Sequence, residues 1–333
     1  MPAPTRTVEA AAIADAYSLG PGPWTVAPVT RGALGRIWKL TGAGSSWAVK
    51  EMLFGCDEEQ VAREAALRDA AEALGISAPR LHANRDGVHV TRLGESAVKL
   101  YDWVEGSSAD ASAPGILDWF GRAAGLVHRA GAGAEGPVDG WYERCPDGAE
   151  WKELGEKVRR AELPWAGELE NFVKGVVPEL SEWVGPAGDA DLVTSHLDFQ
   201  PQNVLVGPEG PVLLDWDNAG TISAEQELAR ALFVWSGGNE PDVERARRIV
   251  RAYRSAGGPG AIRGVRSFSM LFATALNYVR VQADCAVDPE VTEDQRAFGA
   301  EQAVRCMRVI PRLGAVNLLV EAVGAGAGQP ADR

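Results

Sequence analysis

The chain has 333 residues, of which 46% are apolar, and it carries a formal net charge of −13. A chain of this length and apolar content can bury the core of one large domain or of two lobes, which excludes an intrinsically disordered protein. The acidic balance argues against a nucleic-acid partner, because phosphate backbones bind to positive surfaces, and it favours a cationic ligand.

The sequence shows no pattern for secretion or membrane insertion. Its first segment, MPAPTRTVEAAAIADAYSLG, has acidic residues inside the apolar part, and no run of about eighteen apolar residues occurs in the chain. The cysteines lack the spacing of a zinc site or of a disulfide framework; they are Cys56, Cys145, Cys285 and Cys306. We therefore expect a cytoplasmic protein without a membrane partner.

Strand-like segments dominate the first third of the sequence. Gly and Ser residues separate them, which predicts an antiparallel meander. The predicted strands cover residues 24–30, 36–42, 46–53, 87–93 and 96–104. A short helix is predicted at 7–18. A longer one is predicted at 57–75, where apolar residues recur at helical spacing and Gly75 marks the end.

The character of the sequence changes after Gly106. Helical patterns dominate the remainder, and they cover residues 116–133, 149–184 and most of 225–312. One hairpin lies among them, with strands at 204–206 and 212–214. This order predicts an α+β fold with two lobes, residues 1–105 and 106–333.

The stretch VTSHLDFQPQNVLVGPEGPVLLDWDNAG, residues 193–220, places acidic and amide side chains at the ends of two apolar segments. Its GPEGP turn predicts the hairpin, and antiparallel pairing would bring Asn203 close to Asp215. An amide oxygen and a carboxylate form an oxygen-only site that suits Mg²⁺. Asp198 precedes Asn203 by five residues and can face the same ion from the substrate side.

This spacing supplies the parts of a phosphoryl-transfer site. The reaction needs metal ligands beside the nucleotide phosphates and a carboxylate that accepts the proton of the attacking hydroxyl. Protein kinases have H-R-D-x4-N followed by D-F-G. Here H-L-D-x4-N is followed by D-W-D, and neither D-F-G nor A-P-E occurs, so the sequence is not that of a protein kinase in detail.

The same segments resemble the aminoglycoside phosphotransferase and choline kinase group, the small-molecule relatives of protein kinases. SHLDFQPQNVLV and VLLDWDNAG match its H-G-D-x4-N and I-D-W/F-E/D signatures, with Leu197 in place of the usual Gly. QELARAL matches its D-L-A segment, with Glu227 in place of Asp, and FGRAAGLVH resembles its L-G-x-x-L-A-x-L-H helix. The resemblance covers about residues 29–236. It implies a bilobal protein-kinase-like fold with a small β-rich lobe and a larger, mostly helical lobe.

The resemblance also assigns nucleotide-binding residues in the first third. WAVK places Lys50 at the end of a strand as the lysine that binds the phosphates, and Glu64, fourteen residues later, would be its ion-pair partner. TRGALGRIWKL holds Gly32 and Gly35 where the group has its phosphate-covering loop.

The segment AVKLYDWVEG resembles the hinge between the two lobes of the group, which implies a hinge at about residues 101–106. By this alignment the Asp102 C=O and the Val104 N–H would bind the purine edge. Trp103 would pack against the nucleotide cleft, and Tyr101 would be the gatekeeper. A bulky gatekeeper narrows the adenine pocket, which leaves GTP open beside ATP.

The resemblance divides the polar residues of the hairpin region by role. Asp198 would position and deprotonate the acceptor hydroxyl, and Asn203 with Asp215 would hold Mg²⁺. His196 would brace the catalytic loop. Asp217 would either contact a second metal or brace the loop, and we favour bracing or an indirect metal contact.

The acceptor-binding residues are less defined by the sequence. In this group, acidic residues of the helical lobe hold cationic substrates, which makes Asp284, Asp288 and Glu290 candidate substrate ligands. Glu227 is either a fourth candidate or an anchor of the catalytic loop. Nothing in the sequence specifies an oligomeric state.

The resemblance implies an ATP-dependent kinase that uses Mg²⁺ and phosphorylates a hydroxyl group of a small molecule. Our main hypothesis is an antibiotic of the aminoglycoside, basic peptide or nucleoside type, because an added phosphate would abolish target recognition and confer resistance. A metabolic kinase for choline, an amino sugar, a sugar or homoserine is the alternative. A nucleotide-binding pseudokinase is disfavoured because every catalytic position is filled.

Overall fold

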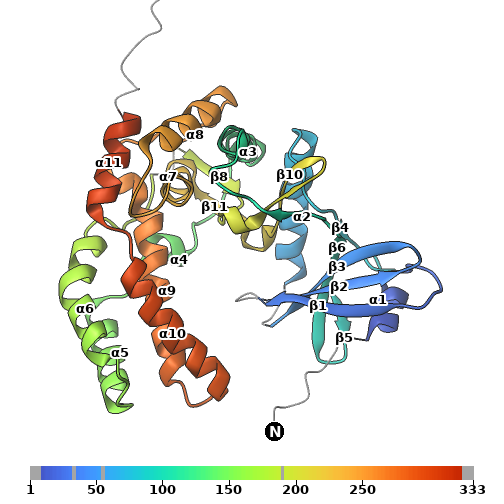
Figure 1. Ribbon diagram of the computed structural model, residues 1–333, viewed down its shortest axis with the longest axis horizontal. Helices are drawn as coiled ribbons and strands as arrows, with labels where there is room; N and C mark the ends of the chain where they lie inside the picture. The colour runs from blue at the N-terminus through green and yellow to red at the C-terminus, as the bar shows by residue number, and fades with distance from the viewer. Residues whose placement is uncertain (1–8, 32–34, 54–56, 189–190, 325–333) are drawn as a thin grey trace, which may run out of the picture. The chain divides into compact units, whose positions relative to one another are not determined.

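The computed structural model describes residues 9–31, 35–53, 57–188 and 191–324 of the chain (Figure 1). The chain forms two compact units, and each is built from two pieces of the sequence. The first unit combines Met1–Asp110 with Pro201–Ala219, and the second combines Ala111–Gln200 with Gly220–Arg333. The predicted hairpin therefore belongs to the same unit as the strands of the first third.

The first unit contains a six-stranded antiparallel sheet. Its spatial order is β1-β2-β3-β6-β4, and β5 also pairs with β6. The strands are β1 (Thr25–Arg31), β2 (Gly35–Gly42), β3 (Ser45–Met52), β4 (Leu81–His82), β5 (Thr91–Leu93) and β6 (Ser96–Asp102). The predicted meander is confirmed. Strand β4 escapes prediction, because two residues are too few to show an alternating pattern.

The two faces of this sheet differ in character. Side chains alternate between the faces along each strand, so Val49 and Lys50 point in opposite directions. Lys50 on β3 and Lys99 on β6 are direct cross-strand partners and share one face. The other face packs with helix α1 (Ala10–Ala16) into an apolar cluster of Ile13, Tyr17, Trp38, Leu40, Val49, Val98 and Leu100.

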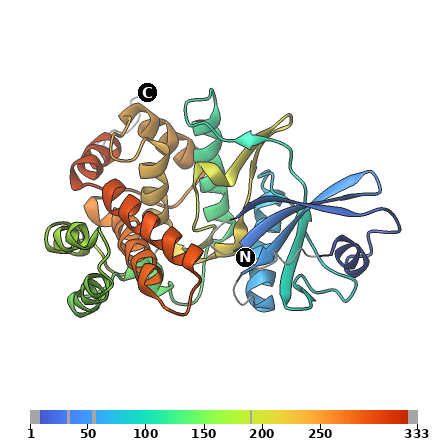
Figure 2. The same ribbon diagram turned by 60° about the horizontal axis from the view of Figure 1, so that its bottom comes forward.

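Helix α2 (Glu58–Ala73) covers the lysine-bearing face, on the side of the sheet away from α1 (Figure 2). The helix begins at Asp57, whose side chain accepts a hydrogen bond from the Glu59 N–H at 3.1 Å. Its buried side chains recur three or four residues apart, and they are Val61, Glu64, Leu67, Arg68 and Ala71. The helix therefore directs one carboxylate, that of Glu64, toward the two lysines.

The predicted hairpin is confirmed as β9 (Val204–Gly207) and β10 (Gly210–Leu213), and β7 (Ser107–Ser108) pairs with the outer edge of β9. Pairing continues past the strand ends, because the Leu214 N–H donates to the Asn203 C=O at 2.8 Å. The segment before β9 and the segment after β10 therefore lie side by side at one end of the hairpin.

The second unit is mainly helical, with one antiparallel pair of short strands, β8 (Leu192–Ser195) and β11 (Gly220–Ser223). Its helices are α3 (Ile116–Ala130), α4 (Gly140–Glu143), α5 (Gly148–Arg160), α6 (Ala166–Ser181), α7 (Ala224–Trp235), α8 (Val243–Ser255), α9 (Ser269–Val287), α10 (Glu293–Val309) and α11 (Leu313–Gly324). The predicted helical segment 149–184 is thus two helices. Among the described residues, no helix combines the length and apolar character needed to cross a membrane.

Helices α3 and α8 approach each other closely because glycines of α3 face the backbone of α8. A Cβ atom at Gly121 would overlap the Ile249 carbonyl, and one at Gly125 would lie 2.8 Å from the Tyr253 carbonyl oxygen. This close contact brings His128 of α3 within 2.7 Å of the Tyr253 hydroxyl on α8.

Replacing Gly121 with alanine should lower the free energy of unfolding by about 1–3 kcal/mol, because the added methyl group overpacks the contact between α3 and α8. Gly155→Ala in α5 is the matched control, since a Cβ there meets nothing within 4 Å. That control should raise the free energy of unfolding by up to about 1 kcal/mol through helix propensity. Urea denaturation measures both values, and equal effects would contradict the close approach.

Candidate active site

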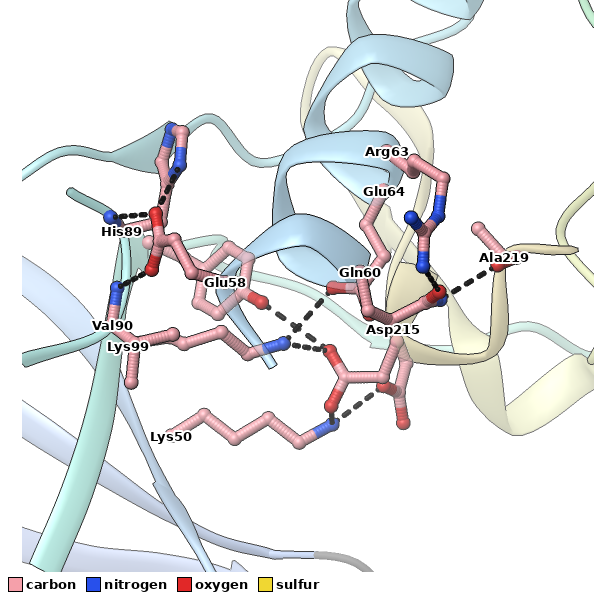
Figure 3. A network of polar contacts seen from close by, with 12 residues as sticks. Lys50, Glu58, Gln60, Arg63, Glu64, His89, Val90, Lys99, Asp215 and Ala219 are labelled. Atoms are coloured by element: carbon pink, nitrogen blue, oxygen red, sulfur yellow. Dashed lines mark hydrogen bonds and ion pairs between the residues drawn. The ribbon is translucent and has the colours of Figure 1, made fainter. Parts of the chain in front are cut away.

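The Lys50 side chain joins strand β3 to the segment that follows β10. Lys50 is 7% exposed, and its Nζ lies 2.6 Å from Oδ1 of Asp215 and 2.7 Å from Oδ2 of Asp217 (Figure 3). Burial alone would lower the pKa of Lys50, but the carboxylates of Asp217 and Asp215 outweigh burial and raise this pKa above its ordinary value. The ammonium group is therefore charged at neutral pH.

The ion pair that we expected between Lys50 and Glu64 is not the one in the structure. Glu64 pairs instead with Lys99, whose Nζ lies 3.1 Å from Oε2 of Glu64 and 2.7 Å from Oδ1 of Asp217 (Figure 3). The reason is the register of β3 and β6, which puts a second lysine opposite Lys50 and within reach of the helix. A motif search confined to one strand cannot reveal that second lysine.

Glu64 is a carboxylate in a poorly solvated position. Its side chain is 5% exposed, and burial raises its pKa to about 7, although the Lys99 ammonium partly offsets the rise. The nearby Asp217 carboxylate raises the Glu64 pKa further. Glu64 therefore changes its charge near neutral pH, unlike an ordinary glutamate.

Asp217 lies at the centre of this network. Its side chain is 5% exposed; Oδ1 contacts Lys99 and accepts a hydrogen bond from the Tyr101 hydroxyl at 3.3 Å, while Oδ2 contacts Lys50. Burial would raise the pKa of Asp217, but Lys50 and Lys99 outweigh burial and lower it. Both carboxylate oxygens are thus engaged by side chains of the sheet, which supports bracing over direct metal contact.

Asp215 and Asn203 occupy the end of the hairpin that the sequence predicts for a metal. Asp215 adopts a left-handed backbone, with φ of 59°, and its side chain is 41% exposed. Asn203 ends the short 3₁₀ turn Pro201–Asn203 and is 9% exposed. A non-glycine residue with a left-handed backbone, such as Asp215, is uncommon and is often found at functional sites. The Lys50 ammonium shows that the Asp215 carboxylate accepts a cation.

The two protein ligands expected for the metal fit a magnesium ion better than a structural metal site. Within the described residues, His, Cys, Asp and Glu form no group of three or more that could hold a metal. Magnesium does not need such a cage, because it usually keeps several waters and binds to one or two carboxylates together with substrate phosphates. A single carboxylate with one amide oxygen is compatible with this chemistry.

The predicted hinge lies at the end of β6. Asp102 pairs across the sheet with Trp47, and its carboxylate accepts from the Arg80 N–H and contacts Nε2 of His82 at 2.7 Å. Trp103 donates from Nε1 to Oε1 of Glu105 at 2.6 Å. Their roles in purine binding, together with that of Val104, stay predictions.

The predicted phosphate-covering loop is described only in part. Gly32 lies outside the described residues. Gly35 begins β2, and a Cβ there would lie 3.2 Å from Cε of Lys50 and 2.9 Å from the Glu51 carbonyl oxygen. Glycine at this position therefore leaves room for the Lys50 side chain.

Asp198 follows β8 in the second unit, where several groups fix its carboxylate. Nη2 of Arg230 lies 3.1 Å from Oδ1 of Asp198, and the Gln200 side-chain amide donates to the same oxygen. Burial would raise the pKa of Asp198, but Arg230 and the hydrogen bond from Gln200 outweigh burial and lower it. His196 is fully buried, stacks on Phe199 and accepts the Asp198 N–H at 3.3 Å through Nδ1, which supports a bracing role.

Leu197 replaces the usual glycine of the motif, and it adopts the backbone of a glycine, with φ of 61°. Two side chains of helix α7 hold this strained residue from both sides. Oε1 of Glu227 accepts its N–H at 2.5 Å, and Nη1 of Arg230 donates to its C=O at 3.1 Å. The sequence analysis missed Arg230, although it lies one turn after Glu227 on the same helix face.

The structure corrects the reading of Glu227 as a substrate ligand. Its side chain is 1% exposed, and its second oxygen contacts Nε2 of His128 at 2.8 Å. Both oxygens are thus engaged within the protein core. Glu227 contacts the loop that carries Asp198, in agreement with the alternative that Glu227 is an anchor of the catalytic loop.

The remaining candidate substrate residues lie near the end of helix α9. Asp284 is 35% exposed and lies 3.5 Å from Nε of Arg280 and 3.8 Å from Nζ of Lys157. Asp288 accepts a hydrogen bond from the Glu290 N–H at 2.9 Å. These contacts do not involve Asp198 or its loop, and the three acidic residues stay predictions.

Comparisons with known proteins confirm the resemblance seen in the sequence. A model of a phosphotransferase enzyme family matches residues 25–265. A homoserine kinase of Parvibaculum lavamentivorans is 28% identical over 191 residues, which are 54% of this chain and 55% of that protein. The chain thus spans about half the length of the curated relative that it matches.

Two solved structures show the fold. A spectinomycin phosphotransferase in complex with ADP and spectinomycin has a TM-score of 0.62 and 14% identity, over 90% of this chain and 93% of that one. An aminoglycoside phosphotransferase of Alicyclobacillus acidocaldarius has a TM-score of 0.61 and 16% identity, over 97% and 98% of the two chains. They confirm the expected α+β, protein-kinase-like fold.

The raised pKa of Glu64 predicts a stability that falls as the pH rises from about 4.5 to about 7. The folded state holds the Glu64 proton more tightly than the unfolded state, so its contribution is present below the ordinary pKa of 4.5 and is lost as the pH passes about 7. The full shift corresponds to about 3 kcal/mol.

The side chain in Glu64→Gln cannot titrate. Between about pH 5 and about pH 7.5, the free energy of unfolding of this variant should therefore fall less, or rise more, than that of the wild type. Urea denaturation of both proteins at the two pH values measures this difference. An identical pH dependence in both would show that Glu64 titrates normally.

Proposed function

We propose that this chain, which belongs to the phosphotransferase enzyme family, is a small-molecule kinase with a hydroxyl acceptor. Its phosphoryl donor in this proposal is ATP, with GTP as the alternative. One contact carries the proposal. Lys50 and Asp215, which the motifs assign to the phosphates and to the metal, lie 2.6 Å apart although 165 positions separate them in the sequence. This contact between two family motifs supports a nucleotide site.

In this proposal the first unit binds the nucleotide. The Lys50 ammonium, already charged and nearly buried, contacts the phosphates, and Gly35 leaves space beside it. The Asp102 C=O and the Val104 N–H contact the purine, within a hinge at 101–106. The spectinomycin phosphotransferase crystallised with ADP supports a nucleotide donor.

Asn203 and Asp215 would hold the magnesium ion in this proposal. When bound, the ion neutralises charge on the phosphates. Asp215 presents a partly exposed carboxylate for it, and its left-handed backbone sets the direction of that carboxylate. Asp217 keeps the adjacent turn in place through its contacts with the sheet.

Asp198 accepts the proton of the acceptor hydroxyl in this proposal. Arg230 and Gln200 hold its carboxylate and keep it ionised, as a proton acceptor needs to be at neutral pH. His196 and Glu227 fix the backbone on either side of it.

Two observations bear on the acceptor. The net charge of −13 favours a cationic small molecule, and a structural neighbour acts on the antibiotic spectinomycin, which supports an antibiotic acceptor and a role in resistance. The similarity to a homoserine kinase favours the alternative, a metabolic acceptor such as homoserine. We propose the cytoplasm as the compartment, because the described cysteines, Cys145, Cys285 and Cys306, are free thiols.

A coupled ATP-consumption screen distinguishes these functions. The acceptors are aminoglycosides, spectinomycin, basic peptide and nucleoside antibiotics, choline, amino sugars, sugars and homoserine, each with ATP and with GTP. Turnover with an antibiotic supports resistance, and turnover with only a metabolite supports the metabolic alternative. Asp198→Asn should lower the turnover number by about 10²–10⁴-fold, because the proton acceptor is lost. A wild type that turns over no acceptor would favour a pseudokinase.

Arg230→Met tests the electrostatic role of the arginine beside Asp198. Loss of the guanidinium removes the main influence that lowers the pKa of Asp198, and burial then raises it. The acidic limb of the kcat/KM profile should therefore move to higher pH. Arg230→Lys, which keeps the charge, should move it less. An unmoved acidic limb in Arg230→Met would show that Arg230 does not set the ionisation of Asp198.

A further inference from the structure

The register of the sheet in the first unit creates an electrostatic problem. Lys50 and Lys99 are direct partners on β3 and β6, and like charges placed opposite each other are unfavourable. The two lysines are only 7% and 1% exposed, so water cannot screen the repulsion. The surrounding acidic side chains have to stabilise both.

Those acidic side chains form one continuous chain of contacts with the lysines. Glu64 of α2 contacts Lys99, Lys99 contacts Asp217, Asp217 contacts Lys50, and Lys50 contacts Asp215, at distances between 2.6 and 3.1 Å (Figure 3). Helix α2 is thus linked to Lys50 through Lys99 and Asp217, where the sequence motifs imply a direct pair between Glu64 and Lys50.

Lys99 has a second consequence for the charge of Asp217. A buried carboxylate that loses its only cation is strongly destabilised. Asp217 has two, one on each oxygen, so Lys50 can turn toward a phosphate while Lys99 still neutralises Asp217. Lys50 is therefore held by Asp215 and Asp217, and a move of Lys50 toward a phosphate would not leave Asp217 without a cation.

We propose that Lys99 is a positioning residue for phosphate binding: it holds Asp217, and through Asp217 it sets the place of the Lys50 ammonium. This inference rests on the proposed nucleotide-binding function. It adds a residue that the family motifs of the sequence do not include. A purely structural Lys99 would affect folding alone and leave the nucleotide affinity of the folded protein unchanged.

The decisive variant is Glu64→Gln, because two explanations predict opposite results for it. If only net charge matters, removing this negative charge strengthens ADP binding at a pH above the Glu64 pKa of about 7, where the wild-type carboxylate is ionised. If Glu64 fixes Lys99, and Lys99 fixes Lys50 through Asp217, the same variant weakens binding, by about tenfold. Titration calorimetry with ADP and Mg²⁺ measures the dissociation constant without any acceptor or turnover.

Lys99→Met and Lys99→Arg complete the test. Lys99→Met should weaken ADP binding by about tenfold or more, and Lys99→Arg should recover part of the loss. In the double variant, Glu64→Gln should add little to Lys99→Met, since both break the same chain of contacts. Lys174→Met is the control: it removes an exposed lysine of α6 and its ion pair with Glu170, and ADP affinity should not change.

Melting temperatures of all variants separate folding from binding. A folded Lys99→Met and a folded Glu64→Gln that both bind ADP as the wild type does would overturn the inference and leave the proposed function intact. If Lys99→Met does not fold, Glu64→Gln decides, and unchanged or tighter binding overturns the inference. A wild type that binds no ADP would overturn the proposed function and, with it, the role of Lys99.

Discussion

One buried carboxylate, that of Asp217, organises the first unit. It is the shared counterion of two lysines that the β3–β6 register places face to face, and neither lysine is solvated well enough to be stable alone. The turn after β10 is therefore tied to two strands of the sheet through charge, and Glu64 ties helix α2 to the same point. Three parts of the sequence that are far apart thus depend on one another through a single group.

One proposed metal ligand, Asp215, and the residue directly before Asp198, Leu197, have backbone conformations that would be unfavourable in isolation. Asp215 and Leu197 both have positive φ, and neither is a glycine. In each case contacts from a neighbouring element compensate for the strain: Lys50 holds the Asp215 carboxylate, and side chains of α7 hold both the N–H and the C=O of Leu197. Such strain is found where a protein has to aim a side chain in one fixed direction.

Much of this architecture could be predicted from the sequence. The meander, helix α2 and the hairpin follow from local patterns and motif spacing, and the family resemblance implies that Lys50 and Asp215 belong to one site. The partner of Glu64 could not be predicted in this way. Lys99 reaches Glu64 because Lys99 lies opposite Lys50, and this strand register is not encoded by any local motif. Strand β4 is too short to leave a pattern. Arg230 was not predicted, because the family motif that QELARAL matches specifies only the acidic position, Glu227, and not the arginine one turn later.

In the proposed role, Lys99 keeps Asp217 in place, Asp217 sets where the Lys50 ammonium lies, and Lys50 reaches the phosphates from that position. A crystal structure of the wild-type protein with ADP and Mg²⁺ tests it most directly. We predict that Nζ of Lys50 contacts a phosphate oxygen, while Nζ of Lys99 remains within hydrogen-bond distance of both Asp217 and Glu64. A structure in which Glu64 pairs with Lys50 and Lys99 has turned away from Asp217 would contradict the claim.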